Sequence, residues 1–371
     1  MPFPHKLRIL VAPLDWGLGH TTRCIPVIRA LLQHDAEVII AGNKIQEKVL
    51  LAEFPHCKFL FLQGYGVTYS TTGKGFFWKM IQQFPRIAST IKRENSWLKE
   101  LLIRERIDGI ISDNRFGLYT SKIPSVFITH QLRIQTGLGQ LADDMAQRVN
   151  YRYINRFNQV WVPDFNGTQN LAGVLSHPSS MPATNVAYVG PLTRMGNRPS
   201  VNEGRGILFI FSGPEPQRSF FEQKVFAQLK DIKQKVTVIR GKPLLEDLPL
   251  IADAVIYNHL PGNEMEAVMR SAALIVCRSG YSSVMDINAL ELKSILIPTP
   301  GQTEQEYLAD YLMQKKFAIK GSQSDFNLQD LLQKAAGFSY NGFINQEGLL
   351  LTKEVAGFLD KCREQLIKEE S

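Results

Sequence analysis

The segment Leu274–Asp286, which reads LIVCRSGYSSVMD, decides the fold of this chain. Its first residues are apolar up to Cys277, as in a buried strand, and a Ser-Gly turn then opens a helix. Backbone N–H groups at the start of a helix attract a phosphate-like anion. Asp286 follows Gly280 by six residues, where its carboxylate can accept hydrogen bonds from two neighbouring ribose hydroxyls. The alternative for Asp286 is a solvated acid on the helix.

Short apolar runs alternate with helical stretches over almost the whole chain, which is typical of parallel sheets with crossover helices. We predict an α/β protein of two doubly wound, Rossmann-like domains whose central crevice binds ligands at the strands' carboxyl ends. The predicted parts are an N-terminal domain (1–194), a linker (195–204), a second domain (205–351) and a C-terminal helix (352–371) that packs back on the first domain. The predicted strands are Leu7–Pro13, Glu37–Ala41, Lys58–Leu62, Asp108–Ser112, Ser125–His130, Gln159–Val162, Val186–Val189, Gly206–Phe211, Val236–Arg240, Ala254–Tyr257, Leu274–Cys277, Ser294–Pro298 and Ala318–Lys320.

The composition narrows the class of protein. A chain of 371 residues is longer than a single hydrophobic core usually supports, which favours two domains. No run of about 18 apolar residues indicates a membrane-spanning helix. Because the first residues lead directly into a strand rather than a signal peptide, we expect a cytoplasmic protein. The four cysteines are scattered, as free thiols are. The formal charge of +7 favours an anionic partner, but the dispersed basic residues disfavour nucleic acid.

The loop Gly17-Leu18-Gly19-His20-Thr21-Thr22 follows the first predicted strand. Its glycines let the backbone pass close to a ligand. A dinucleotide fingerprint needs a third glycine where Thr22 stands, which disfavours a nicotinamide or flavin enzyme. His20 begins a helix beside the predicted crevice, and because its ordinary pKa is near neutrality it could take a proton from a hydroxyl. The alternative is that His20 only caps the helix.

A proline-rich loop, residues 298–307 with the sequence PTPGQTEQEY, follows the strand after the Ser-Gly turn and enters another helix. Amide and carboxylate side chains at a helix start can bind sugar hydroxyls through paired donors and acceptors. Ordinary capping of the helix is the alternative.

Together these segments resemble the MurG family of GT-B glycosyltransferases, cytoplasmic enzymes that add N-acetylglucosamine to a lipid-linked peptidoglycan precursor. The resemblance covers both domains. It is specific in the second, where the Cys-Arg-Ser-Gly turn, the acid six positions later and a Gln-(Gln/Glu)-Tyr element recur in the family's order. It implies the GT-B architecture, with a UDP-sugar as co-substrate and no separate cofactor.

The resemblance assigns residues to the donor. The family's acidic residue holds the ribose of UDP, which implies Asp286. Its paired glutamines contact the donor sugar, which implies Gln305 and Glu306, with a glutamate replacing the second glutamine. The turn residues along the diphosphate are Ser279, Gly280, Tyr281 and Ser282.

Three further donor contacts are implied. Uracil is bound through backbone groups near Leu260, and Arg194 matches an arginine that faces a phosphate, unless it is an exposed linker residue. The family's first phosphate loop corresponds to Ser212-Gly213-Pro214-Glu215, where proline removes a donor and glutamate adds like charge. Either this loop faces the acceptor or the donor sits differently.

The resemblance also assigns an acceptor site in the first domain. The family carries a histidine in the first loop that is implicated in acceptor activation, which implies His20 as the catalytic residue. The acceptor-binding positions, from that loop and two later strand ends, are Gly17, Gly19, Asp113, Asn114, His130 and Gln131. For Asp113 and Asn114 the alternative is turn formation.

Residues 74–86, KGFFWKMIQQFPR, combine bulky apolar with basic residues. Phe76, Phe77 and Trp78 on a short amphipathic element suit an anionic bilayer surface, and the resemblance implies an acceptor domain that docks on the inner face of the cytoplasmic membrane. A lipid-linked acceptor fits this expectation. The alternative is packing of these side chains against the sheet.

We therefore expect inverting sugar transfer to an acceptor hydroxyl. A helix N-terminus and arginines can stabilise the leaving diphosphate without a metal, and no Asp-x-Asp motif occurs. Two alternatives stay open at this point: a non-hydrolysing UDP-sugar epimerase, and a non-catalytic subunit that binds nucleotide-sugars.

Overall fold

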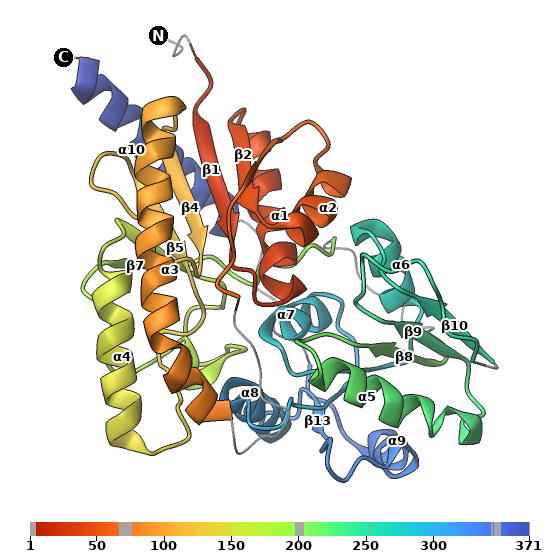
Figure 1. Cartoon of the computed structure of the whole chain (residues 1–371). Coiled ribbons are helices and arrows are strands. Elements are labelled where there is room, and N and C mark those ends of the chain that lie inside the picture. Colours follow the sequence, from red (N-terminus) through yellow and green to blue (C-terminus); the bar gives the residue numbers. More distant parts are fainter. Residues whose placement is uncertain are drawn as a thin grey trace.

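The computed structural model describes residues 5–66, 76–196, 204–251, 253–342, 344 and 350–370. These residues form two parallel sheets, one from each half of the sequence (Figure 1). The elements of the first half are β1 (Arg8–Pro13), α1 (Leu18–Gln33), β2 (Glu37–Gly42), α2 (Lys44–Glu53), β3 (Lys58–Phe61), α3 (Phe76–Arg104), β4 (Gly109–Asp113), β5 (Ser125–Ile128), α4 (Gln140–Ile154), β6 (Gln159–Val162) and β7 (Asn185–Tyr188). Those of the second half are β8 (Ile207–Ile210), α5 (Gln217–Phe226), β9 (Val236–Ile239), β10 (Ala254–Tyr257), α6 (Gly262–Arg270), β11 (Leu274–Cys277), α7 (Tyr281–Ala289), β12 (Ser294–Leu296), α8 (Thr303–Gln314), β13 (Ile319–Lys320), α9 (Leu328–Gly337) and α10 (Leu350–Glu370).

The N-terminal sheet is doubly wound, with the strand order β3-β2-β1-β4-β5-β6-β7. Alternate residues of β1 enter different cores: Ile9 and Val11 pack with α1, whereas Leu10 and Ala12 pack with α3. Both faces are therefore covered, which is why the strands read as continuous apolar runs. Each strand predicted from the sequence is present in the structure, and its ends lie within two residues of the predicted ends.

The C-terminal sheet has the order β10-β9-β8-β11-β12-β13. The strand order reverses between β1 and β4 in the first sheet and between β8 and β11 in the second. Parallel doubly wound sheets bind ligands at these switch points, because the loops from two neighbouring strands diverge there and leave a crevice. Four of the segments singled out from the sequence lie at the ends of these strands, whereas the loop 298–307 follows β12 and His130 follows β5.

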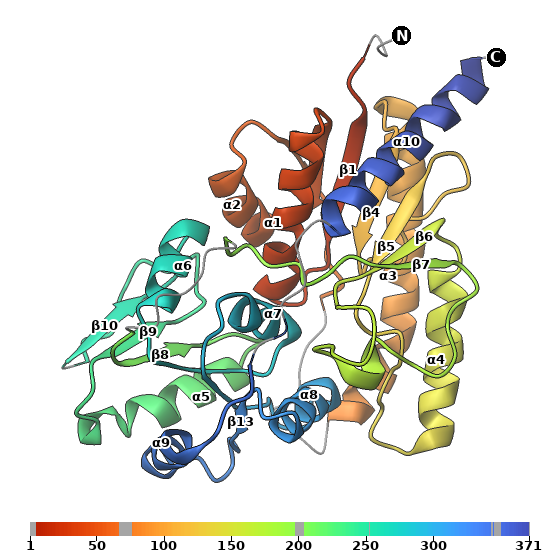
Figure 2. The same ribbon diagram turned by 180° about the vertical axis from the view of Figure 1, so that it is seen from behind.

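The C-terminal helix α10 returns to the N-terminal domain, where it crosses the strands of the first sheet (Figure 2). The rings of Phe358 and Trp161 meet edge to face with centroids 6.0 Å apart. Gln159 donates a 2.9 Å hydrogen bond to Glu354. Both ends of the chain consequently lie on the same side of the molecule (Figure 1).

The structure covers the predicted linker and membrane segment only in part. In the linker, Gly196 donates its N–H to Glu266 of α6 at 2.6 Å, and residues 197–203 lie outside the described residues. The backbone of α3 begins at Phe76, but the side chains of Phe76, Phe77 and Trp78 lie outside the described part. No helix among the described residues is long and apolar enough to cross a membrane.

Candidate active site

The start of α7 is open toward the crevice. Gly280 is its N-cap, and no side chain caps the helix. A Cβ built on Gly280 would meet no heavy atom within 4 Å. The buried Ser279 hydroxyl donates to the carbonyl of Gln305 at 2.8 Å, which ties this turn to α8. The helix start can therefore receive an anion, as predicted for Ser279, Gly280 and Ser282.

Tyr281 does not place its side chain along that space. Its ring stacks on His130 of the N-terminal domain, with centroids 4.1 Å apart. Its hydroxyl donates to the carbonyl of Pro163 at 2.8 Å. The prediction of a diphosphate contact is therefore wrong for this side chain, because the ring is buried in the domain junction; only the backbone of Tyr281 remains at the helix start.

Asp286 lies on α7 beside the domain crossover. Its carboxylate accepts a 2.6 Å hydrogen bond from Thr193. Burial raises the pKa of Asp286, and the nearby charge of Arg194 opposes that rise. Nε of Arg194 is buried and has no hydrogen-bond partner within the part of the chain that the structure describes. An unsatisfied guanidinium N–H beside Asp286 is a vacant donor for a phosphate oxygen.

The predicted base site contains a residue that the sequence did not single out. Leu260 is buried, and its neighbour His259 is only partly exposed. Burial, followed by the charges of Arg194 and Lys48, lowers the pKa of His259 to about 4. His259 is therefore uncharged at neutral pH, in the same corner as Arg194 and Asp286.

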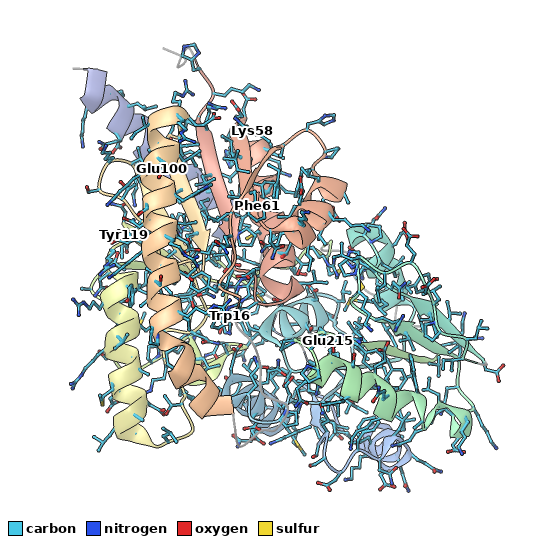
Figure 3. The ribbon with its side chains drawn as sticks, viewed as in Figure 1. Trp16, Lys58, Phe61, Glu100, Tyr119 and Glu215 are labelled. Atoms are coloured by element: carbon cyan, nitrogen blue, oxygen red, sulfur yellow. The ribbon has the colours of Figure 1, made fainter. Side chains whose placement is uncertain are left out.

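Glu215 has a structural role in the loop that corresponds to the family's first phosphate loop. Gly213 has a φ of 99°, which favours glycine, and a Cβ there would meet only Thr299 Oγ1, 3.9 Å away. The Glu215 carboxylate turns back onto α5, where it accepts from Ser219 N at 3.1 Å and pairs with Arg218 at 2.7 Å (Figure 3). A diphosphate at the start of α5 would therefore meet the Glu215 carboxylate, whereas no described side chain caps the start of α7. Ser212 is the first residue of this loop.

Gln305 and Glu306 both serve the loop that leads into α8. Oε1 of Gln305 accepts from Thr299 N, and Oε1 of Glu306 accepts from Gly301 N, each at 2.9 Å. These oxygens therefore hold the loop before α8 and do not cap the helix, whose N-cap Gln302 has no side-chain cap. Thr299 Oγ1 and Gln302 Oε1 are buried without partners in the described residues, so polar capacity remains in this loop for a ligand.

His20 and Asp113 form a pair at the switch point of the first sheet. Nδ1 of His20 lies 3.2 Å from Oδ2 of Asp113, while Arg23 binds the same carboxylate through Nε at 2.8 Å and through Nη2. Burial acts to raise the pKa of Asp113, but Arg23 and His20 outweigh it and lower the pKa to about 2. Burial, then Arg23, lowers the pKa of His20. His20 is thus a neutral base beside a fixed carboxylate.

His130 lies in the junction between the domains, where it contacts residues of both, and it does not line the acceptor site. Its Nε2 lies 2.8 Å from Oε1 of Glu304 and its Nδ1 lies 3.4 Å from Nη1 of Arg23. With Tyr281 against its face, its imidazole has no edge left for a ligand, and it is 4% exposed. The predicted acceptor contact is therefore corrected for His130. Gln131 is half-buried and donates to Glu304.

Of the remaining predicted acceptor positions, the two glycines lie beside open space or the second domain, whereas Asn114 and Asp113 have structural roles. Gly17 has a φ of 79° and open space around its Cβ position. A Cβ on Gly19 would come within 2.7 Å of Ser282 Oγ, so the two loops touch across the crevice. Asn114 has a φ of 56° and forms the turn after β4. Asp113 is fully buried and acts behind His20 rather than on the rim.

Besides His259, sequence reasoning missed three residues of this site. Arg23 follows His20 by one helical turn, and that spacing could have identified it. Trp16 precedes the glycine loop and packs edge to face on Tyr65 (Figure 3), and its buried indole N–H has no partner among the described residues. Glu304 reaches a residue 174 positions away, for which no sequence signal exists.

Among the described residues, no group of three or more His, Cys, Asp or Glu side chains could hold a metal ion. The charged groups of the crevice are engaged in ion pairs with arginine or histidine instead.

Comparison with known proteins places the second domain. Residues 207–339 match the model of the glycosyltransferase family 28 C-terminal domain. The UDP-N-acetylglucosamine-N-acetylmuramyl-(pentapeptide) pyrophosphoryl-undecaprenol N-acetylglucosamine transferase of Desulforudis audaxviator is 34% identical over 101 residues, 24% of this chain and 27% of that protein. The enzyme of the same name from Glaesserella parasuis is 36% identical over 72 residues, 19% of this chain and 20% of that protein. The aligned segments thus span less than a third of either relative.

Solved structures match the whole chain at low sequence identity. Acinetobacter baumannii MurG has a TM-score of 0.51 at 16% identity and covers 97% of this chain and 95% of its own. Glycyrrhiza uralensis UGT73P12 has a TM-score of 0.60 at 12% identity, and the match covers 98% of this chain and 97% of that chain. These matches show the fold. The second half of the chain is therefore similar to the glycosyltransferase family 28 C-terminal domain, and the whole chain has the two-domain GT-B fold.

Proposed function

We propose that this protein is an inverting, metal-independent glycosyltransferase that moves a sugar from a UDP-sugar to an acceptor hydroxyl. The observation that carries the proposal is the contact of Gly19 with Ser282. It holds the loop of His20 against the open start of α7, so that a base and an anion-binding helix face one space. Transfer between a diphosphate donor and a hydroxyl needs those two elements.

His20 is the group that takes the acceptor proton. Its Nε2 has no hydrogen-bond partner among the described residues, and the side chain is 18% exposed. With the hydrogen of the imidazole on Nδ1, facing Asp113, Nε2 presents a lone pair to the acceptor. Asp113 stays ionised and stabilises the imidazolium that forms as the acceptor oxygen attacks the anomeric carbon.

The leaving diphosphate is stabilised by the second domain. The N–H groups at the start of α7 and the free Nε of Arg194 supply positive potential. Asp286 accepts from the ribose hydroxyls after exchanging its contact with Thr193. Uridine is the proposed base because the curated relatives are named as UDP-N-acetylglucosamine transferases. N-acetylglucosamine is the first donor sugar to test.

The acceptor binds on the N-terminal side of the crevice, against Gly17 and the unpartnered indole N–H of Trp16. We propose a lipid-linked acceptor and contact with an anionic membrane surface. An exposed apolar stripe along α4 supports this: Leu141 is 83% exposed and Met145 67%. Arg148 and Arg152 are exposed beside the stripe. The helix runs beside α3, whose first residues include Phe76, Phe77 and Trp78 (Figures 1 and 2).

The family match favours a transferase over the two alternatives. The family model and the reported relatives are transferases, whereas an epimerase would convert a UDP-sugar with no acceptor present. A non-catalytic binding subunit would not need a buried carboxylate behind a neutral histidine.

The test begins with a thermal-shift screen against UDP-, GDP- and dTDP-sugars, because a ligand that binds only the native state raises Tm. We expect UDP-sugars to give the largest shift. Sugar release from UDP-N-acetylglucosamine is then measured with lipid-linked and soluble acceptors, with and without EDTA. Loss of activity in EDTA, restored by Mn²⁺, would contradict the metal-independent mechanism. Epimer formation without an acceptor would contradict the transferase.

A further inference from the structure

Glu304 joins the two domains at the place where the predicted donor site and the predicted acceptor site are adjacent. It lies in the first turn of α8, directly before Gln305 and Glu306, the positions expected at the donor sugar. Its carboxylate binds Nε2 of His130 at 2.8 Å through one oxygen and Nε2 of Gln131 through the other. The donor-side helix and the acceptor-side strand end are thus held by one side chain.

His130 transmits this contact to Arg23. An arginine N–H can only donate, so the approach of Arg23 Nη1 to Nδ1 of His130 places the lone pair on Nδ1 and the hydrogen on Nε2. Nε2 then donates to Glu304. The imidazole is held in place by Tyr281, which stacks on its face. Little freedom remains for His130 to move without moving Arg23.

Arg23 in turn fixes the pair that carries the proposed chemistry. Its guanidinium binds the Asp113 carboxylate through Nε and Nη2, and Nη2 also lies 2.9 Å from Nδ1 of His20. Nδ1 of His20 thus has two partners within reach, Arg23 at 2.9 Å and Asp113 at 3.2 Å, and the position of Arg23 decides which of them it faces. Facing Asp113 keeps the hydrogen on Nδ1 and leaves Nε2 as the base; facing Arg23 moves the hydrogen to Nε2 and removes the base.

We propose that Glu304 is a positioning residue, which couples the donor-side helix to the catalytic histidine through His130 and Arg23. This inference rests on the proposed function. Glu304 touches neither His20 nor the reacting atoms; it acts by holding Arg23 on Asp113.

The charges of the cluster predict the sign of the effect. Four charged or titratable groups face His20: Arg23 on its own helix, Asp113 at the end of β4, His130 after β5 and Glu304 on α8. Tyr281 of α7 packs on His130. The protonated form of His20 and the Glu304 carboxylate attract one another. Removal of that carboxylate takes this attraction away, so the pKa of His20 should fall further.

The test is an NMR titration of labelled histidine in the full chain, with the His20 signal assigned by its loss in a His20→Gln variant. Glu304→Gln keeps an acceptor for His130 but removes the charge, whereas Glu304→Asp keeps the charge. Asp310→Asn is the matched control, because Asp310 lies on the same helix, 54% exposed, paired with Lys320. We expect a downward shift of the His20 pKa in Glu304→Gln alone.

Activity gives the second readout. Hydrolysis of UDP-N-acetylglucosamine, with water as the acceptor, should lose about tenfold to a hundredfold in kcat in Glu304→Gln, with the donor KM changed by less than about twofold. His130→Leu, which can bind neither Arg23 nor Glu304 but keeps both of their charges, should lower kcat as well. An unchanged His20 pKa in a folded Glu304→Gln protein, or wild-type kcat in a folded His130→Leu protein, would overturn the proposal. The titration needs no substrate, so a protein that transfers no sugar would contradict the proposed function and not this coupling.

Discussion

Nδ1 of His20 lies 3.2 Å from Oδ2 of Asp113, although the two residues are 93 positions apart in the sequence. They meet because β1 and β4 are neighbours in the sheet: Asp113 ends β4, and His20 lies in the first turn of α1, the helix that follows β1. Arg23 binds the same carboxylate, so the histidine faces a carboxylate that is already ionised and fixed. The site's charge state follows from this three-way contact.

Replacement of His20 by glutamine should lower kcat about a hundredfold to ten-thousandfold, which is the usual contribution of a general base. UDP affinity, measured by calorimetry, should stay at the wild-type value because His20 is on the acceptor side. The acid limb of the wild-type kcat/KM profile should lie below pH 6.5, since burial and then Arg23 lower the His20 pKa. Wild-type turnover in the His20→Gln protein would exclude this base.

Asp113 should make the fold acid-sensitive. Its pKa is depressed from 3.8 to about 2, so its contribution is complete above pH 3.8 and is lost as the pH falls toward 2. The contribution is about 2 kcal/mol. Urea unfolding at pH 5 and pH 3 measures it, and Asp113→Asn should flatten this part of the pH dependence. A mutant with the same pH slope as wild type would show that other carboxylates account for it.

Gly280→Ala should weaken nucleotide binding without weakening the fold. The backbone of Gly280 has a φ of −70° and a ψ of 137°, which alanine adopts freely, and no atom lies within 4 Å of the new methyl. That methyl projects into the space proposed for the diphosphate. We expect UDP affinity to fall about tenfold or more with Tm unchanged. Gly337→Ala, also in open space but distant from the crevice, is the control; equal UDP affinity in both variants would place the diphosphate elsewhere.

Asp286→Asn should reduce UDP affinity about tenfold to a hundredfold, because a charged acceptor for hydroxyl groups is worth about 1.5–3 kcal/mol. Thymidine diphosphate, which lacks the ribose 2′-hydroxyl, should be affected less. Calorimetric titration of both nucleotides measures the difference, with Asp325→Asn, an exposed acid of the same domain, as the control. Equal losses for the two nucleotides would argue against a contact with the 2′-hydroxyl.

The fold could be predicted because its signal is local. Buried parallel strands such as Leu274–Cys277 must be apolar on both faces, and each is followed by a turn and an amphipathic helix, so their order is visible in the sequence. The vacant start of α7 was equally visible, because Ser279-Gly280 supplies no capping side chain.

The sequence by itself therefore determined the two doubly wound sheets, the switch-point loops and the positions of His20, Gly280 and Asp286. Tertiary structure alone decided how the polar side chains pair. Tyr281, predicted along the diphosphate, stacks on His130, and Glu304 rather than Glu306 bridges the domains. Backbone patterns repeat every two or 3.6 residues and can be read locally, whereas the partner of a buried charge is whichever group the packing of two domains brings within hydrogen-bond distance.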